Sequence, residues 1–530
     1  FSYMWHRAEE LDIIEDFAYL SRIAGQQSQL ECKTLASSAL GDNNLSYITM
    51  PGRVQMDLFK VIQRDHNLVS YKLDYVAETF INDSINTVDG KTLKIKGSIN
   101  LNDGNFITIN YGNGDKYKKN KKFKVEKVDL DQDIITLEEP IDNWLADKKA
   151  KWQLAKDDVS PQDIFRLQKG DADDRKIVAV YCIMDCKLCL DIINKLDIIT
   201  NNIGMANVCS VPLSYIFLRG QGVKIFSFVA KQCRKEKYLV PVIKHNAEEK
   251  KVSRHEVKPK FEYTEEADLD VTDEDGGYEG AIVLKPTPGI YLDTPVSVMD
   301  YASLYPSSMI SENLSHDSII LNEKYMGDDG IKELEKLGYG YVDVSYDVYK
   351  WIDPKIKSKG KTKVGVQTCR FAQPKDGSKG IIPRILQALL KARKNKRKQI
   401  KYKTVSDKEG NQYKGLLEKT DTEHIIKNVE GKEWKVKNED VVKVEDTFNE
   451  FQKAVKDGFQ LAYKVTANSL YGQIGARTSP IYLKDIAAST TATGRKLLHL
   501  ARDKVHEKFE GAKVVYGDTD SIFVNFNAKD

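Results

Sequence analysis

The sequence lacks the features that mark several classes of protein. Its 530 residues contain no apolar run near the ~20 residues of a membrane-spanning helix, and its start shows no basic-then-apolar signal pattern. Its 81 basic and 78 acidic residues leave a net charge of +3. This balance excludes a uniformly basic packaging protein, but not an enzyme that acts on nucleic acid. We find no internal repeat.

Cysteine is also scarce, with seven residues in the whole chain. The odd number and the missing signal pattern favour reduced thiols inside a cell. Cys182, Cys186 and Cys189 lie close together, but their segment has a helical pattern. No nearby histidine or fourth cysteine completes a zinc site there.

The length predicts three or four domains at ~150 residues each. Helical patterns alternate with short apolar segments over residues 1–84 and return over 160–235. Between them, β-prone segments separated by turn signals predict a small antiparallel β unit at 85–150. These segments are 92–97, 106–111, 123–128 and 134–137.

Charge is unevenly distributed in the second half of the chain. Residues 264–275 hold seven acids and no base, which is typical of a flexible, solvated linker. Residues 384–403 hold nine cations and no acid. A segment poor in apolar residues, 404–445, separates this basic helical pattern from a second one at 448–475. Together they predict a long helical hairpin with a polar tip.

Acidic residues stand at the ends of two β-prone segments. Asp300 follows one of them, while Asp518 and Asp520 lie between two others in a predicted hairpin. Residues two apart in an extended chain point the same way, and neighbouring carboxylates repel unless a cation lies between them. Oxygen ligands of this kind suit Mg²⁺. A solvated acidic turn is the alternative.

Polar and aromatic residues share faces of the two hairpin helices. Lys464, Asn468 and Tyr471 are spaced i, i+4, i+7, which suits a nucleotide, with the cation on phosphate and the ring against a base. Arg393 and Arg397 are also i, i+4, and such a cationic face favours polyphosphate. The alternatives are a half-exposed helix with a core tyrosine and a solvated basic helix.

Tyr181 and Asp185 also lie one helical turn apart. This spacing would let the phenol and the carboxylate contact the same water, but polar pairs at i, i+4 are common on helices.

Together these motifs resemble those of the family B DNA polymerases over nearly the whole chain, and most closely the delta-type replicative enzymes of eukaryotes and large DNA viruses. The segment from Asp300, Asp-Tyr-Ala-Ser-Leu-Tyr-Pro-Ser, resembles the first palm motif. The segment from Lys464, Lys-Val-Thr-Ala-Asn-Ser-Leu-Tyr-Gly, resembles the fingers motif. The segment from Tyr516, Tyr-Gly-Asp-Thr-Asp-Ser, resembles the second palm motif.

Two shorter matches extend the resemblance. Tyr181-x-x-x-Asp185 is similar to the third motif of the proofreading exonuclease, and Tyr278-Glu-Gly-Ala281 to the link that touches template. The first two exonuclease motifs and the thumb have no counterpart here, so the resemblance implies a fragment that lacks the N-terminal part and the thumb. We also expect an exposed strand edge beside residues 521–526.

The resemblance implies an α/β multidomain fold, with a partial ribonuclease-H-like 3′–5′ exonuclease domain followed by a right-hand polymerase palm and fingers. The expected parts are the exonuclease domain at 1–235 with an insertion at 85–150, a linker region at 236–285, the palm at 286–378 and 476–530, and the fingers at 379–475 with an insertion at 404–445.

The implied function is template-directed DNA synthesis in replication, by two-metal phosphoryl transfer, with proofreading in the intact parent. Asp300, Asp518 and Asp520 would be catalytic and would hold two Mg²⁺ ions with the backbone carbonyl of Tyr301. The other implied site residues are Ser303, Leu304, Tyr305, Arg393, Arg397, Lys464, Asn468 and Tyr471 for nucleotide, Tyr181 and Asp185 for the exonuclease, and Tyr278, Gly280, Ala281 and Gly472 for template and DNA.

The expected partners are primer–template DNA, deoxynucleoside triphosphates, and a sliding clamp or other replication proteins, with no membrane. The expected location is intracellular, in the host nucleus or a cytoplasmic viral replication site. A catalytically inactive, polymerase-like DNA-binding protein is the main alternative, and the three intact acids argue against it. Tyr305 argues against a polymerase that accepts ribonucleotides, and the cationic helix against an unrelated acidic metal-binding protein.

Overall fold

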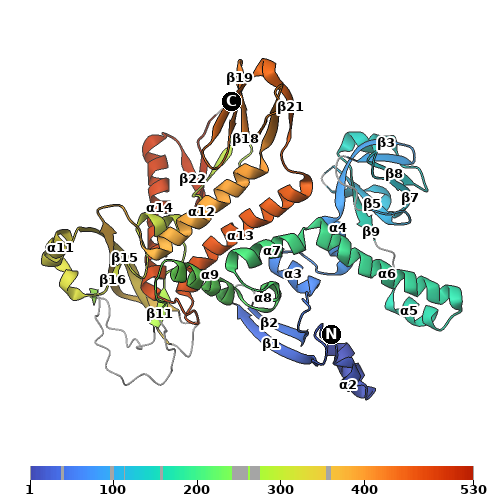
Figure 1. Cartoon of the computed structure of the whole chain (residues 1–530), viewed down its shortest axis with the longest axis horizontal. Helices are drawn as coiled ribbons and strands as arrows, with labels where there is room; N and C mark the ends of the chain where they lie inside the picture. The colour runs from blue at the N-terminus through green and yellow to red at the C-terminus, as the bar shows by residue number, and fades with distance from the viewer. Residues whose placement is uncertain are drawn as a thin grey trace. The chain divides into compact units, whose positions relative to one another are not determined.

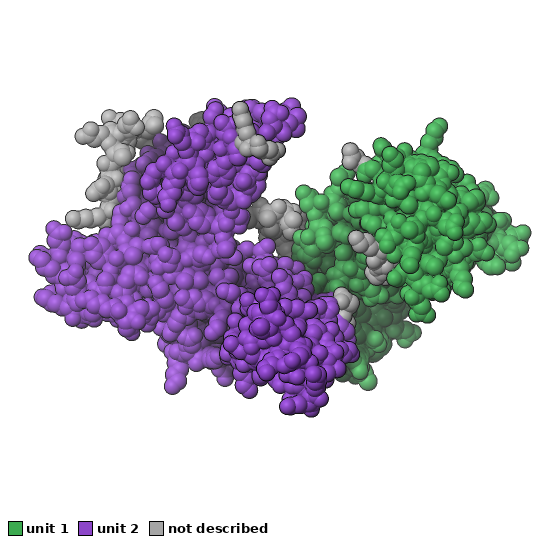
Figure 2. Space-filling view, turned by 90° about the horizontal axis from the view of Figure 1, so that it is seen from above, with its two compact units in different colours: residues 1–203 green, residues 204–530 purple. Residues whose placement is uncertain are grey.

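The computed structural model describes residues 2–37, 41–95, 101–112, 114–155, 159–240, 261–262, 275–353 and 360–528. They form two compact units, residues 1–203 and 204–530 (Figure 2), and the fold mixes α-helices and β-sheets as expected. Residues 264–274 of the predicted acidic linker lie outside the described residues. No helix in the described part of the chain is long and apolar enough to cross a membrane.

The first unit begins with short helices around a two-stranded hairpin. The helices are α1 (Ser2–Glu10), α2 (Ile14–Phe17), α3 (Leu58–Asp65) and α4 (Leu73–Phe80), and the hairpin strands are β1 (Gln29–Ser37) and β2 (Gly41–Thr49). Trp5, Ala18 and Ile48 form a small buried core. The side chain of Asp57 caps α3 by accepting a hydrogen bond from the backbone N–H of Lys60.

A closed antiparallel β-barrel follows α4 (Figure 1). Its strands are β3 (Asn82–Asp89), β4 (Thr92–Ile95), β5 (Phe106–Tyr111), β6 (Asp115–Lys116), β7 (Phe123–Asp129), β8 (Ile134–Leu137) and β9 (Lys151–Ala155), with 3₁₀ turns η1 (Tyr117–Lys119) and η2 (Asn143–Lys148). The order is β6-β5-β7-β8-β4-β3-β9, and pairing of β5 with β9 closes the barrel. The four β-prone segments predicted at 85–150 all contain strands, and β3 and β9 extend the unit at both ends.

The unit ends in helices whose starts are capped. The Ser160 side chain and Asp163 form a capping box at α5 (Pro161–Gln168), with proline in the first turn. Asp171 caps the 24-residue helix α6 (Ala172–Lys195), which carries the three clustered cysteines. Helix α7 (Ile198–Cys209) continues into the second unit.

The second unit contains the predicted palm as a four-stranded sheet. Its strands are β12 (Val283–Leu284), β13 (Val296–Asp300), β22 (Lys513–Asp518) and β23 (Ser521–Asn525), in the order β12-β22-β23-β13. Helix α14 (Lys484–Lys508) packs on this sheet through Leu498 and Val505, which contact Ile522 and Val524. The expectation of an exposed strand edge beside residues 521–526 is wrong, because β22 pairs with one side of β23 and β13 pairs with the other.

A second sheet lies beside α14 in this unit. It contains β10 (Phe261–Glu262), β11 (Asp275–Tyr278), β14 (Ile319–Ile320), β15 (Tyr339–Trp351) and β16 (Lys361–Pro374). The short elements nearby are η3 (Glu323–Tyr325) and the helices α8 (Leu213–Leu218), α9 (Gln221–Lys235), α10 (Leu304–Ser311) and α11 (Gly327–Lys336). Helix α9 packs against two long helices, α12 (Ile381–Ile400) and α13 (Glu450–Gly475), although the family resemblance places residues 204–235 in the exonuclease part. The domain boundaries therefore stay predictions.

The predicted helical hairpin is present. Helices α12 (Ile381–Ile400) and α13 (Glu450–Gly475) pack along each other (Figure 1), and a capping box of Asn449 and Gln452 begins the second. The segment between them is a five-stranded antiparallel sheet rather than an irregular polar tip. Its strands are β17 (Lys403–Asp407), β18 (Gln412–Lys419), β19 (Glu423–Lys427), β20 (Glu433–Lys437) and β21 (Val441–Asp446), with η5 (Asn438–Asp440).

Candidate polymerase active site

Strand pairing brings the two acidic motifs together. Asp300, the last residue of β13, pairs with Ser521 at the start of β23, and the N–H of Tyr301 donates to the carbonyl of Asp520 at 2.8 Å. Asp518 pairs with Ser521, so Thr519 and Asp520 form the turn of the β22–β23 hairpin. Asp518 and Asp520 are therefore not joined by extended chain, as their spacing had suggested, since Thr519 adopts a left-handed φ of 53° in that turn.

The three carboxylates have different surroundings. Burial raises the pKa of Asp520, and the negative charges of Asp300 and Asp518 raise it further. Asp518 accepts hydrogen bonds from the hydroxyls of Thr519, at 2.8 Å, and Tyr516, at 3.2 Å. Asp300 is exposed. Repulsion from neighbouring carboxylates therefore acts on Asp520, while both carboxylate oxygens of Asp518 accept hydrogen bonds from hydroxyl groups.

Burial is the main cause of the raised pKa of Asp520, and a bound cation would relieve the part that comes from neighbouring negative charges. Among the described residues, no three His, Cys, Asp or Glu side chains are gathered closely enough to hold a metal ion. A Mg²⁺ site here stays a prediction, in which Asp300 and Asp520 would supply carboxylates and substrate oxygens would take other positions. The roles of Asp518 and of the Tyr301 carbonyl as ligands stay predictions.

The chain turns sharply after Asp300 to begin α10. Ser303 precedes the helix in a left-handed conformation, with φ of 55°, and the N–H of Ser307 donates to its carbonyl at 2.9 Å. Leu304 is 3% exposed as a whole residue, so its side chain is not available to a nucleotide. A Cβ atom on Gly494 of α14 would lie 3.2 Å from side-chain atoms of both Leu304 and Tyr305. The absence of a side chain at Gly494 therefore provides space for the Tyr305 ring.

Tyr305 belongs to a cluster of three tyrosines. Its ring centroid lies 4.5 Å from that of Tyr471, with 34° between the planes. Burial raises the pKa of Tyr471, and a side-chain hydrogen bond with Tyr278 adds to the effect. A Cβ on Gly475 would lie 2.3 Å from the Tyr278 hydroxyl, so α13 needs glycine there. Tyr471 thus packs against its neighbours, while Lys464 and Asn468 on the same helix are exposed.

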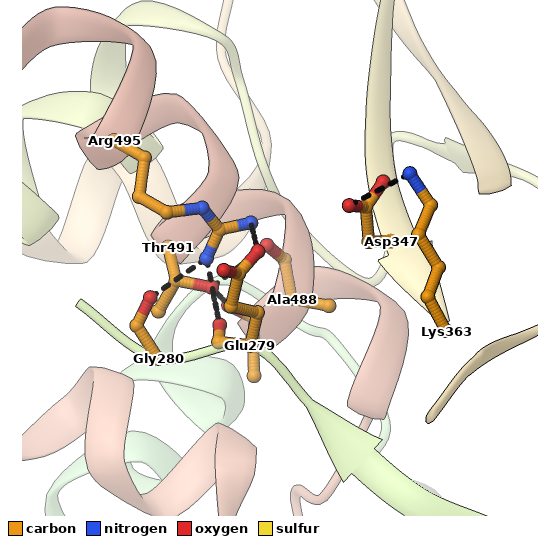
Figure 3. A network of polar contacts seen from close by, with 8 residues as sticks. Glu279, Gly280, Asp347, Lys363, Ala488, Thr491 and Arg495 are labelled. Carbon is orange, nitrogen blue, oxygen red and sulfur yellow. Dashed lines mark hydrogen bonds and ion pairs between the residues drawn. The ribbon is translucent and has the colours of Figure 1, made fainter. Parts of the chain in front are cut away.

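Arg495 of α14 holds the segment that follows Tyr278 (Figure 3). Its Nη1 donates to the carbonyls of Glu279, at 2.8 Å, and Gly280, at 2.7 Å. Its Nη2 lies 3.3 Å from the Glu279 carboxylate, and Thr491 Oγ1 also donates to the Glu279 carbonyl at 2.8 Å. Neither α14 residue was among the candidates from the sequence, because a lone Arg and Thr inside a helical pattern carry no distinctive signal.

The predicted triphosphate cations lie on neighbouring helices. Arg393 and Arg397 are on α12 and Lys464 is on α13. Arg393 Nε donates to Gln460 Oε1 of α13 at 3.4 Å, which ties the two helices together at this level. Arg397 and Lys464 are exposed, so charged groups of both helices are available to a ligand. Their convergence on one triphosphate stays a prediction.

Comparison with protein families gives a direct result. The family described as DNA polymerase family B matches residues 211–416 and 435–530, together more than half of the chain. The chain belongs to DNA polymerase family B. The family B exonuclease domain matches residues 1–76.

Individual relatives agree with the expected delta-type and viral resemblance. A DNA polymerase of Pyramimonas orientalis virus is 48% identical over 530 residues, covering 100% of this chain and 40% of the relative. The DNA polymerase delta catalytic subunit of Dictyostelium discoideum is 29% identical over 99% of this chain and 33% of its own length. The solved family B polymerase of Pyrobaculum calidifontis matches with 22% identity and a TM-score of 0.40, over 69% of this chain and 34% of that one. The chain spans less than half the length of the curated relatives it matches.

The remaining predicted residues of this family B chain have clear positions. Tyr181 and Asp185 lie one turn apart on α6, both half-buried, in a region that neither family match covers. Gly280 and Ala281 are exposed after β11, and Gly472 is exposed on α13 with open space at its Cβ position. The exonuclease, template and DNA-binding roles of these residues stay predictions.

Proposed function

We propose that this chain carries the palm and fingers of a template-directed DNA polymerase, which adds deoxynucleotides to a primer 3′-OH during DNA replication. The observation that carries the proposal is the pairing of β13 with the β22–β23 hairpin, which places Asp300 beside Asp520 in a chain of family B. A catalytically inactive DNA-binding relative would have no need to keep a carboxylate in this unfavourable electrostatic position.

Asp300 and Asp520 would hold two Mg²⁺ ions, with Asp518 and the Tyr301 carbonyl completing the set. Bound Mg²⁺ lowers the pKa of a hydroxyl nucleophile and neutralises charge on a leaving phosphate. The hydroxyls of Tyr516 and Thr519 would fix the orientation of the Asp518 carboxylate by donating hydrogen bonds to it. The primer terminus would then lie at the hairpin turn, where β13 ends.

The other predicted site residues would bind the nucleotide and the template. Arg393, Arg397 and Lys464 would neutralise the triphosphate, with Asn468 on the same face as Lys464. Tyr305 would pack under the sugar and exclude a 2′-OH. Its ring packs against Tyr471 and lies next to Gly494, which has no side chain. The backbone of Ser303 and Leu304 would contact the nucleotide beside it. Tyr278, Gly280, Ala281 and Gly472 would contact template.

We also propose a 3′–5′ exonuclease in the complete protein, supported by the exonuclease match at residues 1–76. Asp185 would be one metal ligand, and Tyr181 would orient the attacking water. A sliding clamp or other replication proteins would be the partners, at an intracellular site in the host nucleus or a cytoplasmic viral replication site.

Primer extension by the complete polymerase tests the main proposal. Asp300→Ala and Asp520→Ala should each lower the extension rate by at least ~100-fold, because charge stabilisation at the reacting phosphate is lost. Asp328→Ala, in the exposed first turn of α11, is the matched control and should change nothing. Extension at wild-type rate by either palm variant would refute the assignment of the site.

A further inference from the structure

The loop between β6 and β7 of the barrel concentrates positive charge. Residues 116–124 contain six lysines and no acid, and we call residues 116–122 the lysine loop. Lys121 pairs with Glu139, and Lys124 Nζ lies 2.6 Å from Glu138. Lys116, Lys118 and Lys119 are exposed. No ion pair with a carboxylate is present at these three lysines within the described residues. A side-chain hydrogen bond with Tyr117 and the nearby charges of Asp142 and Glu139 raise the pKa of Lys118, so its charge is kept while its side chain stays exposed.

The lysine loop is held in an unfavourable backbone conformation. Lys118, Lys119 and Asn120 have φ values of 43°, 56° and 67°, which L-residues other than glycine rarely adopt. Tyr117 anchors the loop, because its hydroxyl donates to Asp142 at 2.7 Å and its ring stacks on Phe123 at 5.8 Å. Strain of this kind persists where the surrounding structure fixes a functional segment. The cations are therefore presented at defined positions.

An exposed tryptophan lies beside this loop. Trp144 of η2 is 42% exposed, and its ring centroid lies 5.2 Å from that of Tyr111 and 6.1 Å from that of Tyr117. The ring planes are nearly perpendicular, at 89° and 73°, so neither tyrosine stacks in parallel on the indole. Lys118 Nζ lies 5.1 Å from the Tyr117 ring. The same tyrosine thus contacts both the indole and the loop cations.

Exposed aromatic rings next to a cationic track are the combination that binds single-stranded nucleic acid, with bases on the rings and phosphates on the cations. Duplex DNA keeps its bases stacked inside, where an indole on a protein surface does not reach them. An acidic protein would use the lysines but gives no role to Trp144. The barrel also lies outside both matched family segments, and it belongs to the first compact unit, whereas the palm acids belong to the second.

We propose that the lysine loop and Trp144 form a binding site for single-stranded DNA, with phosphates on Lys116, Lys118 and Lys119 and a base on the indole. The choice of DNA over RNA rests on the proposed polymerase function; the surface itself does not depend on the palm acids.

Fluorescence anisotropy of a labelled oligo(dT) with the full chain tests the cationic part. Lys118→Glu/Lys119→Glu should weaken binding at least tenfold and reduce the slope of log affinity against log salt by ~0.7 per lost phosphate contact. Lys91→Glu/Lys94→Glu makes the same charge change at exposed positions on and just before β4, which β8 separates from β7. This control should bind oligo(dT) within twofold of wild type. Equal weakening by both double variants would overturn the proposal.

Substitutions of Trp144 test the stacking part. Trp144→Leu should weaken oligo(dT) binding roughly five- to hundredfold, whereas Trp144→Tyr should retain most of it, because a ring still stacks on the base. Both keep an apolar side chain against Tyr111 and Tyr117. Unchanged binding by Trp144→Leu would overturn the single-strand assignment in favour of phosphate-only contact. Displacement of oligo(dT) by polyglutamate of equal charge and concentration would overturn it in favour of an acidic protein.

Binding and synthesis can fail separately. Asp520→Asn, which removes a palm charge, should leave oligo(dT) binding at the barrel intact and abolish primer extension. Photocrosslinking of an iododeoxyuridine oligonucleotide, mapped to Trp144 in this variant, would support the barrel site independently of the polymerase reaction. Crosslinks found only in the palm and fingers would overturn it.

Discussion

Replacement of Arg495 by alanine should release the segment after Tyr278 from α14. Two hydrogen bonds from a charged donor contribute roughly 1.5–3 kcal/mol each. The Glu279 carbonyl keeps the hydrogen bond from Thr491, and the exposed Gly280 carbonyl can bind water, so the lower end of the range applies. The ion pair with Glu279 adds little, because that carboxylate is 42% exposed. We expect the free energy of unfolding to fall by about 3 kcal/mol, mainly through loosening of the segment that follows Tyr278.

The assay combines thermal unfolding with steady-state primer extension. Because Tyr278 contacts Tyr471 and Gly475, loosening its segment should disturb the tyrosine cluster and raise the KM for primer–template more than it lowers kcat. Arg495→Lys keeps the charge, but a single ammonium cannot reproduce the guanidinium fork, so its effect should be intermediate. Arg502→Ala is the control, since Arg502 lies on the same helix and its guanidinium pairs with the neighbouring Asp503 carboxylate on the helix surface. Equal behaviour of Arg495→Ala and Arg502→Ala would refute the reasoning.

Three further outcomes follow from the site. Tyr305→Ala should raise ribonucleotide incorporation by the complete polymerase, measured as the ratio of kcat/KM values for ribo- and deoxynucleotides; an unchanged ratio would contradict the sugar-selection role. Lys464→Ala should raise the KM for nucleotide about tenfold or more, and an effect on primer–template affinity alone would assign Lys464 to DNA binding. Asp520→Asn should raise the melting temperature at neutral pH, because the folded-state pKa of Asp520 lies above its unfolded value and its charged form opposes folding. That gain should shrink as pH falls through the raised pKa, and a gain that grows on acidification would contradict the sign.

The sequence was sufficient to predict the β-hairpin that carries Asp518 and Asp520 and the long helical hairpin, for different reasons. Asp300 and the hairpin with Asp518 and Asp520 were recognised because short motifs in the right order resemble a known family. The helices α12 and α13 were predicted from periodicity alone, and both are present. The local geometry at Asp520 was not predictable from alternation, because it depends on a left-handed turn at Thr519.

The sheet at the tip of the hairpin was missed for a physical reason. Only Val405, Ile426 and Val436 form its buried core, and most other positions in 404–445 are polar. A sheet with so few buried apolar residues gives almost no alternating pattern. The contacts of Arg495 and the space at Gly494 were equally invisible, because they depend on segments more than 180 residues apart in sequence that only the folded chain brings together.

The β-barrel and the sheet at the tip of the helical hairpin each begin and end at nearly the same point in the fold. In the barrel, the first strand pairs with the last, with Asn82 opposite Gln153; in the tip sheet, Lys403 pairs with Asp446. Paired strands lie only ~5 Å apart, so the ends of each insertion are nearly as close as those of a short turn. An ancestral gene could therefore acquire or discard either module in one step, while the helices on each side kept their spacing.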